Sequence, residues 1–134
     1  MVDASLVVKW FAREPGSEVA AALLDGVQAL VAPDVMPLEV ANALWKKVQR
    51  HDVAAGDVAP ALTRLLGLDI VLSPTVDLLQ PAIRMALEIA HPVCDCVYLV
   101  LAEERGAPVA TADIRLRQAA RSRGLRLWKD APTG

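Results

Sequence analysis

The sequence predicts an α/β protein in which a parallel sheet carries helices on both faces. Short apolar runs alternate with helical stretches along the whole chain, and this order is typical of parallel sheets. Hydrophobic residues make up 54% of the 134 residues and aromatic residues only 4%, so the core should be aliphatic. We expect a single domain over residues 1–134, because this length is enough for one sizeable core.

The amino-terminal segment is expected to pass from strand to helix. Residues 1–4 form a short apolar strand, and the apolar residues that follow Ser5 suit a helix. Pro15 and Gly16 interrupt this helix, and Ser17 can cap a second helix that runs to about residue 24.

The next region alternates two expected strands with two helices. Residues 29–32 and 70–72 are short apolar runs, with helical patterns over residues 34–50 and 57–66 between them. Asp34 can cap the first of these helices. Apolar residues at helical spacing predict that its buried stripe consists of Leu38, Ala41, Trp45 and Val48.

The carboxyl-terminal part is expected to contain the most deeply buried helix. A helix over residues 75–91 ends at His91, a lone histidine that we interpret as structural. The next helix starts at Asp95 and is apolar on nearly all faces, which predicts burial, and Gly106 suits its end. The remaining expected elements are a strand over residues 108–110, a basic helix from Asp113 to Gly124, and a strand over residues 125–127.

Four carboxylates stand out because of their positions in these elements. Asp3 follows the first strand, Asp113 follows the fourth strand, and Asp95 opens a helix. Glu39 lies one turn into the helix after the second strand, on a polar line with Asn42. Ligands of parallel sheets bind outside the carboxyl ends of the strands, so these acids can share one pocket. Each acid also has an ordinary interpretation, as a helix cap for the aspartates and as a dipole partner for the glutamate.

A shared pocket of four carboxylates predicts a divalent cation. Without a counterion the anions repel one another, and at least one of them stays protonated. All-oxygen ligands favour Mg²⁺ or Mn²⁺, which can orient and activate a water for attack on a phosphodiester. The sequence contains no Ser-His-Asp set, Cys-His pair or Gly-rich phosphate loop that would indicate a competing chemistry.

Positive charge is concentrated after Asp113. The formal net charge of −2 argues against a generic polyanion binder. Five arginines nevertheless follow Asp113, at positions 115, 117, 121, 123 and 126. They are either a phosphate-binding flank, with Arg115 and Arg117 as the candidate contacts, or a solvated helix face.

The sequence also predicts the compartment. The longest apolar run, residues 96–102, is too short to span a membrane, and Asp3 leaves no apolar core for a signal peptide. We therefore expect a cytoplasmic protein without membrane contact. Cys94 and Cys96 are poorly placed for a mutual disulfide and belong to no zinc-type set, so we expect them to pack.

Four segments together resemble one known family over nearly the whole chain. They are VDASLVVKW, APDVMPLEVANALWK, HPVCDCVYLVLAEERGAPVATAD and the final LRLW. In this order and spacing they resemble the PIN-domain ribonucleases, specifically the VapC toxins of type II toxin–antitoxin pairs. The resemblance implies a three-layer α/β/α sandwich with a central parallel sheet of about four to five strands, and Mg²⁺- or Mn²⁺-dependent endoribonuclease activity.

The resemblance also assigns roles to particular residues. Asp3 and Asp95 match the primary metal ligands, and Glu39 and Asp113 would complete the site directly or through waters. Supporting polar positions match Thr111, Ser5 and Asn42. The resemblance further implies that the protein is a homodimer, that it cleaves RNA, and that a VapB-type antitoxin neutralises it. Cys94 departs from the family, because an aromatic residue commonly precedes the aspartate, and Cys96 is also atypical.

Three other interpretations are open. A haloacid-dehalogenase-type phosphatase needs a second aspartate two residues after its nucleophile, but Asp3 is followed by Ala4 and Ser5. A receiver domain needs adjacent acids after the first strand, which this chain lacks. A PIN-like module that binds RNA or protein without turnover is the third, and the presence of all four acids argues against it.

Overall fold

The protein is built around a short parallel sheet. The structure is a computed structural model that describes residues 1–25 and 29–128. Strands β1 (Leu30–Pro33) and β2 (Ile70–Ser73) pair in parallel, with Leu30 opposite Ile70 and Pro33 opposite Ser73. The parallel pairing confirms the α/β class that the alternating pattern predicts.

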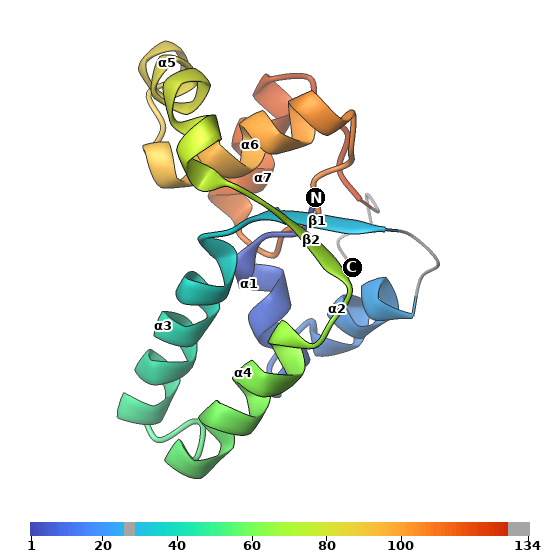
Figure 1. Ribbon diagram of the computed structural model, residues 1–134, viewed down its shortest axis with the longest axis vertical. Coiled ribbons are helices and arrows are strands. Elements are labelled where there is room, and N and C mark those ends of the chain that lie inside the picture. Colours follow the sequence, from blue (N-terminus) through green and yellow to red (C-terminus); the bar gives the residue numbers. More distant parts are fainter. Residues whose placement is uncertain (26–28, 129–134) are drawn as a thin grey trace.

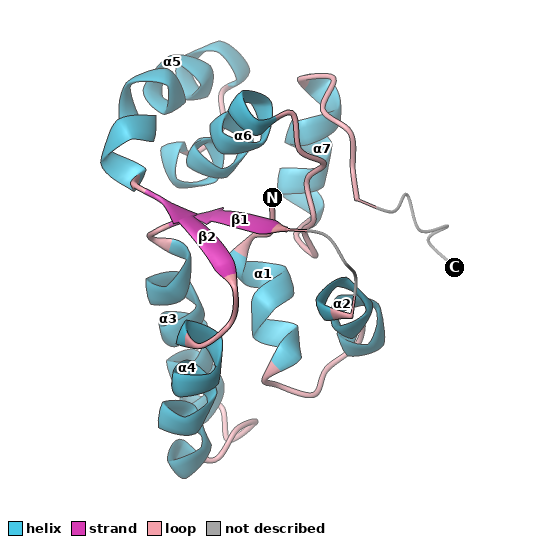
Figure 2. Ribbon diagram, turned by 45° about the vertical axis from the view of Figure 1, so that its right-hand side comes forward, coloured by secondary structure: helices cyan, strands magenta, loops and turns pink. Residues whose placement is uncertain are grey.

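Most of the described chain is helical. The helices are α1 (Ala4–Val7), α2 (Ser17–Leu24), α3 (Met36–Gln49), α4 (Val58–Leu66), α5 (Leu79–Ile89), α6 (Val93–Arg105) and α7 (Ile114–Ser122), with short 3-10 helices η1 (Val8–Trp10), η2 (Ala55–Asp57) and η3 (Thr75–Leu78). Helices α5, α6 and α7 lie on one side of the strand pair, and α1 to α4 lie on the other (Figures 1 and 2). Helices therefore lie on both sides of the strand pair, although Val71 and Leu72 of β2 are exposed.

Three further segments follow β1 one after another across the sheet without forming full strands. The Val2 amide donates to the Val31 carbonyl at 3.0 Å, and Val2 also forms an isolated parallel bridge with Ala110. A second isolated parallel bridge joins Val109 to Leu127. Within residues 1–25 and 29–128, only β1 and β2 are long enough to be strands, so the predicted count of four to five strands is not confirmed.

Helix α6 forms the centre of the core, as its apolar faces predict. Every residue from Cys96 to Ala102 is at most 3% exposed, and the helix packs against α5 and β1. Burial of apolar surface is the dominant favourable term in folding, and this segment contributes to it along its whole length. It also fixes the position of the first turn of α6, which contains Asp95.

The structure corrects the predicted orientation of α3. Its buried residues are Met36, Val40 and Leu44, whereas Leu38 and Trp45 are 69% and 57% exposed. Apolar residues on this helix occur on more than one face, so spacing alone selected the wrong stripe. The face that packs is the one that the helices beside α3 cover, and this is a tertiary property.

Two predicted helix starts are also wrong. Asp34 does not cap α3, because its Oδ1 instead accepts a hydrogen bond from the Thr75 amide at 2.9 Å. Helix α6 begins at Val93 rather than at Asp95, so Asp95 lies inside its first turn. The preceding helix is likewise shorter than predicted, since α5 ends at Ile89.

No single helix of the described residues is long and apolar enough to cross a membrane. The consecutive segments Thr75–Ile89 and Val93–Arg105 meet that criterion only when taken together, with a bend of 111° between them.

Candidate active site

Asp3 is a buried carboxylate at the point where the amino-terminal segment becomes α1. It is 5% exposed and caps α1, with its Oδ1 accepting a hydrogen bond from the Leu6 amide at 3.2 Å. Its own amide donates to the Ala110 carbonyl at 3.1 Å. The cap role that the sequence allowed is therefore present, at the predicted edge of the sheet.

Two hydroxyls hold the Asp3 carboxylate. Thr111 donates to Oδ2 at 2.6 Å, and the Ser5 hydroxyl lies 2.8 and 2.9 Å from the two oxygens. The Thr111 hydroxyl in turn accepts from the Asp113 amide at 3.0 Å, and Ser5 accepts from the Ala112 amide at 3.0 Å. The loop before α7 is thus tied to the start of α1.

The electrostatics of Asp3 are unusual for an aspartate. Burial raises its pKa from 3.8 to about 7, against the opposing hydrogen bonds from Thr111, Ser5 and the Leu6 amide. The negative charge of Asp113 raises this pKa further. Within the described part of the chain, no lysine, arginine or histidine forms an ion pair with Asp3. A cation at this position would therefore relieve a real cost.

Asp113 caps α7, with Oδ1 accepting from the Arg115 amide at 2.8 Å. Arg115 is exposed, and the Arg117 guanidinium donates to the Thr111 carbonyl at 3.4 Å. Arg117 thus lies against the hydroxyl network, whereas Arg115 projects into solvent at the same helix start.

Glu39 projects from the first turn of α3 and meets a residue that the sequence analysis did not assign. The Tyr98 hydroxyl on α6 donates to Glu39 Oε1 at 2.5 Å. Tyr98 is 2% exposed. Its pKa is raised mainly by burial and also by its hydrogen bond to Glu39 and the charge of that residue. Burial also raises the pKa of Glu39, the Tyr98 hydrogen bond lowers it, and the charge of Asp95 raises it. Tyr98 therefore remains a hydrogen-bond donor to this acid.

Asp95 is held by His91, for which the sequence predicts only a structural role. His91 Nε2 lies 2.8 Å from Asp95 Oδ2. Residues four apart on one helix face each other, so this spacing could have suggested the contact. His91, however, precedes α6, and helix geometry alone does not predict the pair. The chain reverses at Ala90, whose φ of 52° is left-handed, and this turn places the imidazole beside Asp95.

The two cysteines differ in their surroundings. Cys96 is buried with its Sγ 3.7 Å from the His91 carbonyl, whereas Cys94 is exposed. Burial and the charge of Asp95 raise the pKa of both thiols. The expected packing role thus holds for Cys96, and both thiols are free.

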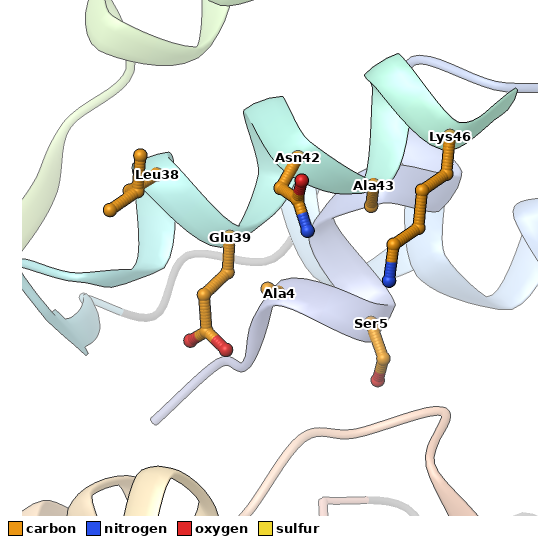
Figure 3. Close-up of a pocket in the computed structure, with 7 residues that line it drawn as sticks. All are labelled: Ala4, Ser5, Leu38, Glu39, Asn42, Ala43 and Lys46. Carbon is orange, nitrogen blue, oxygen red and sulfur yellow. The ribbon is translucent and has the colours of Figure 1, made fainter. Parts of the chain in front are cut away.

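A cleft of about 590 Å³ opens between α1 and α3. Figure 3 shows Glu39, Asn42 and Lys46 extending from α3 towards α1, where Ser5 lines the other wall. Asn42 is exposed in this cleft, as its polar position on α3 suggested. The predicted supporting residues Ser5 and Asn42 therefore lie at one opening.

The charges of the four predicted acids influence one another in two pairs, Asp113 on Asp3 and Asp95 on Glu39. The pKa of Tyr98 is influenced by both Glu39 and Asp3. Among residues 1–25 and 29–128, no three His, Cys, Asp or Glu side chains lie close enough together to hold a metal ion. The donor chemistry nevertheless fits a hard cation, because each pair offers only carboxylate oxygens.

The chain is similar to several known proteins. The PIN domain family model matches residues 1–122. The chain is 30% identical to ribonuclease VapC3 of Pyrobaculum aerophilum, with 88% of this chain and 92% of that protein covered. It is 33% identical to ribonuclease VapC45 of Mycobacterium tuberculosis, covering 93% and 91%. The crystal structure of PAE2754 from Pyrobaculum aerophilum matches the fold with a TM-score of 0.66, at 22% identity, covering 88% and 76%.

Proposed function

This chain belongs to the PIN domain family, and on that premise we propose that it is a VapC-type endoribonuclease toxin that hydrolyses RNA phosphodiester bonds. One observation carries the proposal beyond family membership. The buried Asp3 carboxylate, with a pKa of about 7, has hydroxyl and amide donors around it and the charge of Asp113 nearby. A buried carboxylate with a second acid nearby is suited to a bound cation.

We propose Mg²⁺ or Mn²⁺ as that cation. Carboxylate-bound Mg²⁺ keeps several waters and needs only one or two carboxylates besides substrate phosphates, so a preformed cage of four acids is not required. Asp3 and Asp95 would be the primary ligands, and Glu39 and Asp113 would complete the site directly or through waters. When bound, the cation supplies a polarised phosphodiester oxygen and an acidified water.

The work of this chain's own residues is to hold the acids still. Thr111 and Ser5 fix the oxygens of Asp3, Tyr98 fixes Glu39, and His91 fixes Asp95. Ser5 is a near neighbour of Asp3 in the chain, but Thr111 and Tyr98 are far from their acids in sequence and His91 lies across a turn from Asp95. The tertiary fold therefore sets most of this geometry. Such preorganisation is what makes proximity effective in catalysis.

The partners follow from the same family. We propose a VapB-type antitoxin that covers the active site, a homodimer, and a cytoplasmic location, on the basis of relatives named VapC. Arg115 and Arg117, at the start of α7, would bind RNA phosphates beside Asp113.

Cleavage of a pool of structured and single-stranded RNAs tests the proposal. We expect discrete products with Mn²⁺ or Mg²⁺, none with EDTA, and none with Asp95→Asn, which should keep its fold because it relieves repulsion with Glu39. Full cleavage by Asp95→Asn would contradict the site assignment. RNA binding without metal-dependent turnover, in protein shown to be free of antitoxin, would indicate a binding module. Hydrolysis of phosphate monoesters in place of RNA would indicate a phosphatase.

A further inference from the structure

Helix α3 presents large apolar side chains to solvent. Leu38 and Trp45 are 69% and 57% exposed. Leu38, Asn42 and Trp45 are separated by four and then three residues, so they follow one line along the helix. An exposed tryptophan beside a polar amide can stack on a planar group of a ligand while the amide forms hydrogen bonds to it.

The same face borders the cleft between α1 and α3. Glu39 lies towards one end of the cleft lining and Lys46 towards the other, with Asn42 between them (Figure 3). Lys46 is exposed and, among the residues that the structure describes, has no carboxylate within ion-pair distance. The adjacent Lys47 differs, because it is paired with Glu14. Lys46 is therefore available to an anionic ligand.

We propose that single-stranded RNA lies along this face of α3 and extends from there to the acids. This inference rests on the proposed function. A phosphate contacts Lys46, an unpaired base stacks on Trp45, and the Asn42 amide hydrogen-bonds to the strand between them. Proteins hold single strands through this combination of cations and aromatic side chains. A duplex does not satisfy it, because its bases are already stacked on each other.

Charge favours RNA over a protein as the occupant. From Val40 to the carboxyl end, α3 and its C-cap contain no acidic residue, and they carry Lys46 and Arg50 in addition to Lys47, which is paired with Glu14. The acids lie instead near Glu39, where a metal would offset the repulsion between carboxylates and phosphate. A strand entering from the basic end thus moves towards the proposed site of cleavage.

The experiment measures binding by the full chain, in EDTA so that the RNA is not cut. The probes are a fluorescein-labelled single-stranded RNA of mixed sequence and a duplex of the same length, followed by anisotropy across a salt series. The variants are Lys46→Gln, Trp45→Leu and Trp45→Phe. The matched control is Arg84→Gln, which removes one charge from an exposed arginine on α5, on the other side of the sheet.

We expect Lys46→Gln to weaken single-strand binding and to reduce the salt slope by about 0.7, the value for one phosphate contact. Trp45→Leu should weaken binding about tenfold, and Trp45→Phe should retain most of it because a ring remains to stack on. Arg84→Gln should change neither quantity, and the duplex should bind less well than the single strand.

Two results would overturn this assignment while leaving the proposed function intact. In the first, wild-type protein cleaves RNA with Mn²⁺, yet Lys46→Gln and Trp45→Leu bind the single strand as wild type does. In the second, Lys46→Gln changes the salt slope no more than Arg84→Gln. Either result would leave the Leu38–Trp45 face to a protein partner. Wild-type protein that neither binds nor cleaves any RNA would remove the proposed function together with this inference.

Discussion

The Tyr98 hydroxyl donates a 2.5 Å hydrogen bond to Glu39 and so joins α6 to α3. The two helices lie on opposite sides of the sheet (Figure 1). The hydrogen bond joins them at the candidate site. Because burial and Glu39 both raise the Tyr98 pKa, the phenol keeps its proton over the whole physiological range. Glu39 therefore has a permanent donor that favours its charged form.

Replacing Tyr98 with phenylalanine should raise the pKa of Glu39. The Tyr98 hydrogen bond opposes the effect of burial on that pKa, and its removal leaves burial and the Asp95 charge unopposed. We expect the rising limb of the pH–activity profile to move to higher pH, with about 1–3 kcal/mol lost from the free energy of unfolding at neutral pH. A double-mutant cycle with Glu39→Gln tests whether this loss comes from the Tyr98–Glu39 hydrogen bond. If Tyr98→Phe costs the same stability in wild-type protein and in Glu39→Gln, the bond is not the cause.

Asp3 should make the metal-free protein less stable as pH rises. Its pKa is about 7 in the folded state and 3.8 ordinarily, so the folded state holds the proton more tightly than the unfolded state. The contribution of Asp3 to the unfolding free energy is then greatest below about pH 4 and falls until about pH 7, by roughly 4 kcal/mol at most. Urea unfolding in EDTA at several pH values measures this slope. Asp3→Asn should flatten it, and an unchanged slope would show that another group titrates.

His91 should matter to metal binding through Asp95. Its Nε2 contact restricts the carboxylate to one orientation, and loss of such a partner commonly lowers metal affinity about 10–100-fold. We expect this loss in His91→Leu, whereas His91→Gln should keep most of the affinity because it retains an N–H donor. Titration with Mn²⁺, followed by electron paramagnetic resonance of the free ion, measures affinity without reference to activity. Equal affinity in the leucine and glutamine variants would exclude a positioning role.

The arginines at the start of α7 should contribute to the salt dependence of RNA binding. If Arg115 and Arg117 each contact one phosphate of a single strand, replacing both with alanine should reduce the salt slope by about 1.4. Arg115→Ala alone isolates the electrostatic part, because Arg117 also donates to the Thr111 carbonyl. An unaltered slope in the double variant would identify these residues as a solvated helix face.

Local pattern predicted much of the fold because it reflects local physics. The buried helix α6 follows from its apolar faces, and the parallel pairing of β1 with β2 follows from the alternation of elements. The same reasoning failed on α3, where Leu38 and Trp45 are apolar but exposed. When apolar residues occur on several faces of a helix, their spacing does not indicate which face other elements will cover.

For the candidate site, the sequence by itself determined which acids exist and that Asp3 and Asp113 follow sheet segments. It also indicated Ser5 and Thr111, whose hydroxyls hold Asp3. Only the tertiary structure decided that Tyr98 bonds Glu39, that the turn at Ala90 brings His91 to Asp95, and that the charges of the acids influence one another in two pairs. The physical reason is that helix and strand preferences act between near neighbours in the chain, whereas these contacts and the burial that shifts the Asp3 pKa arise only when distant segments pack together.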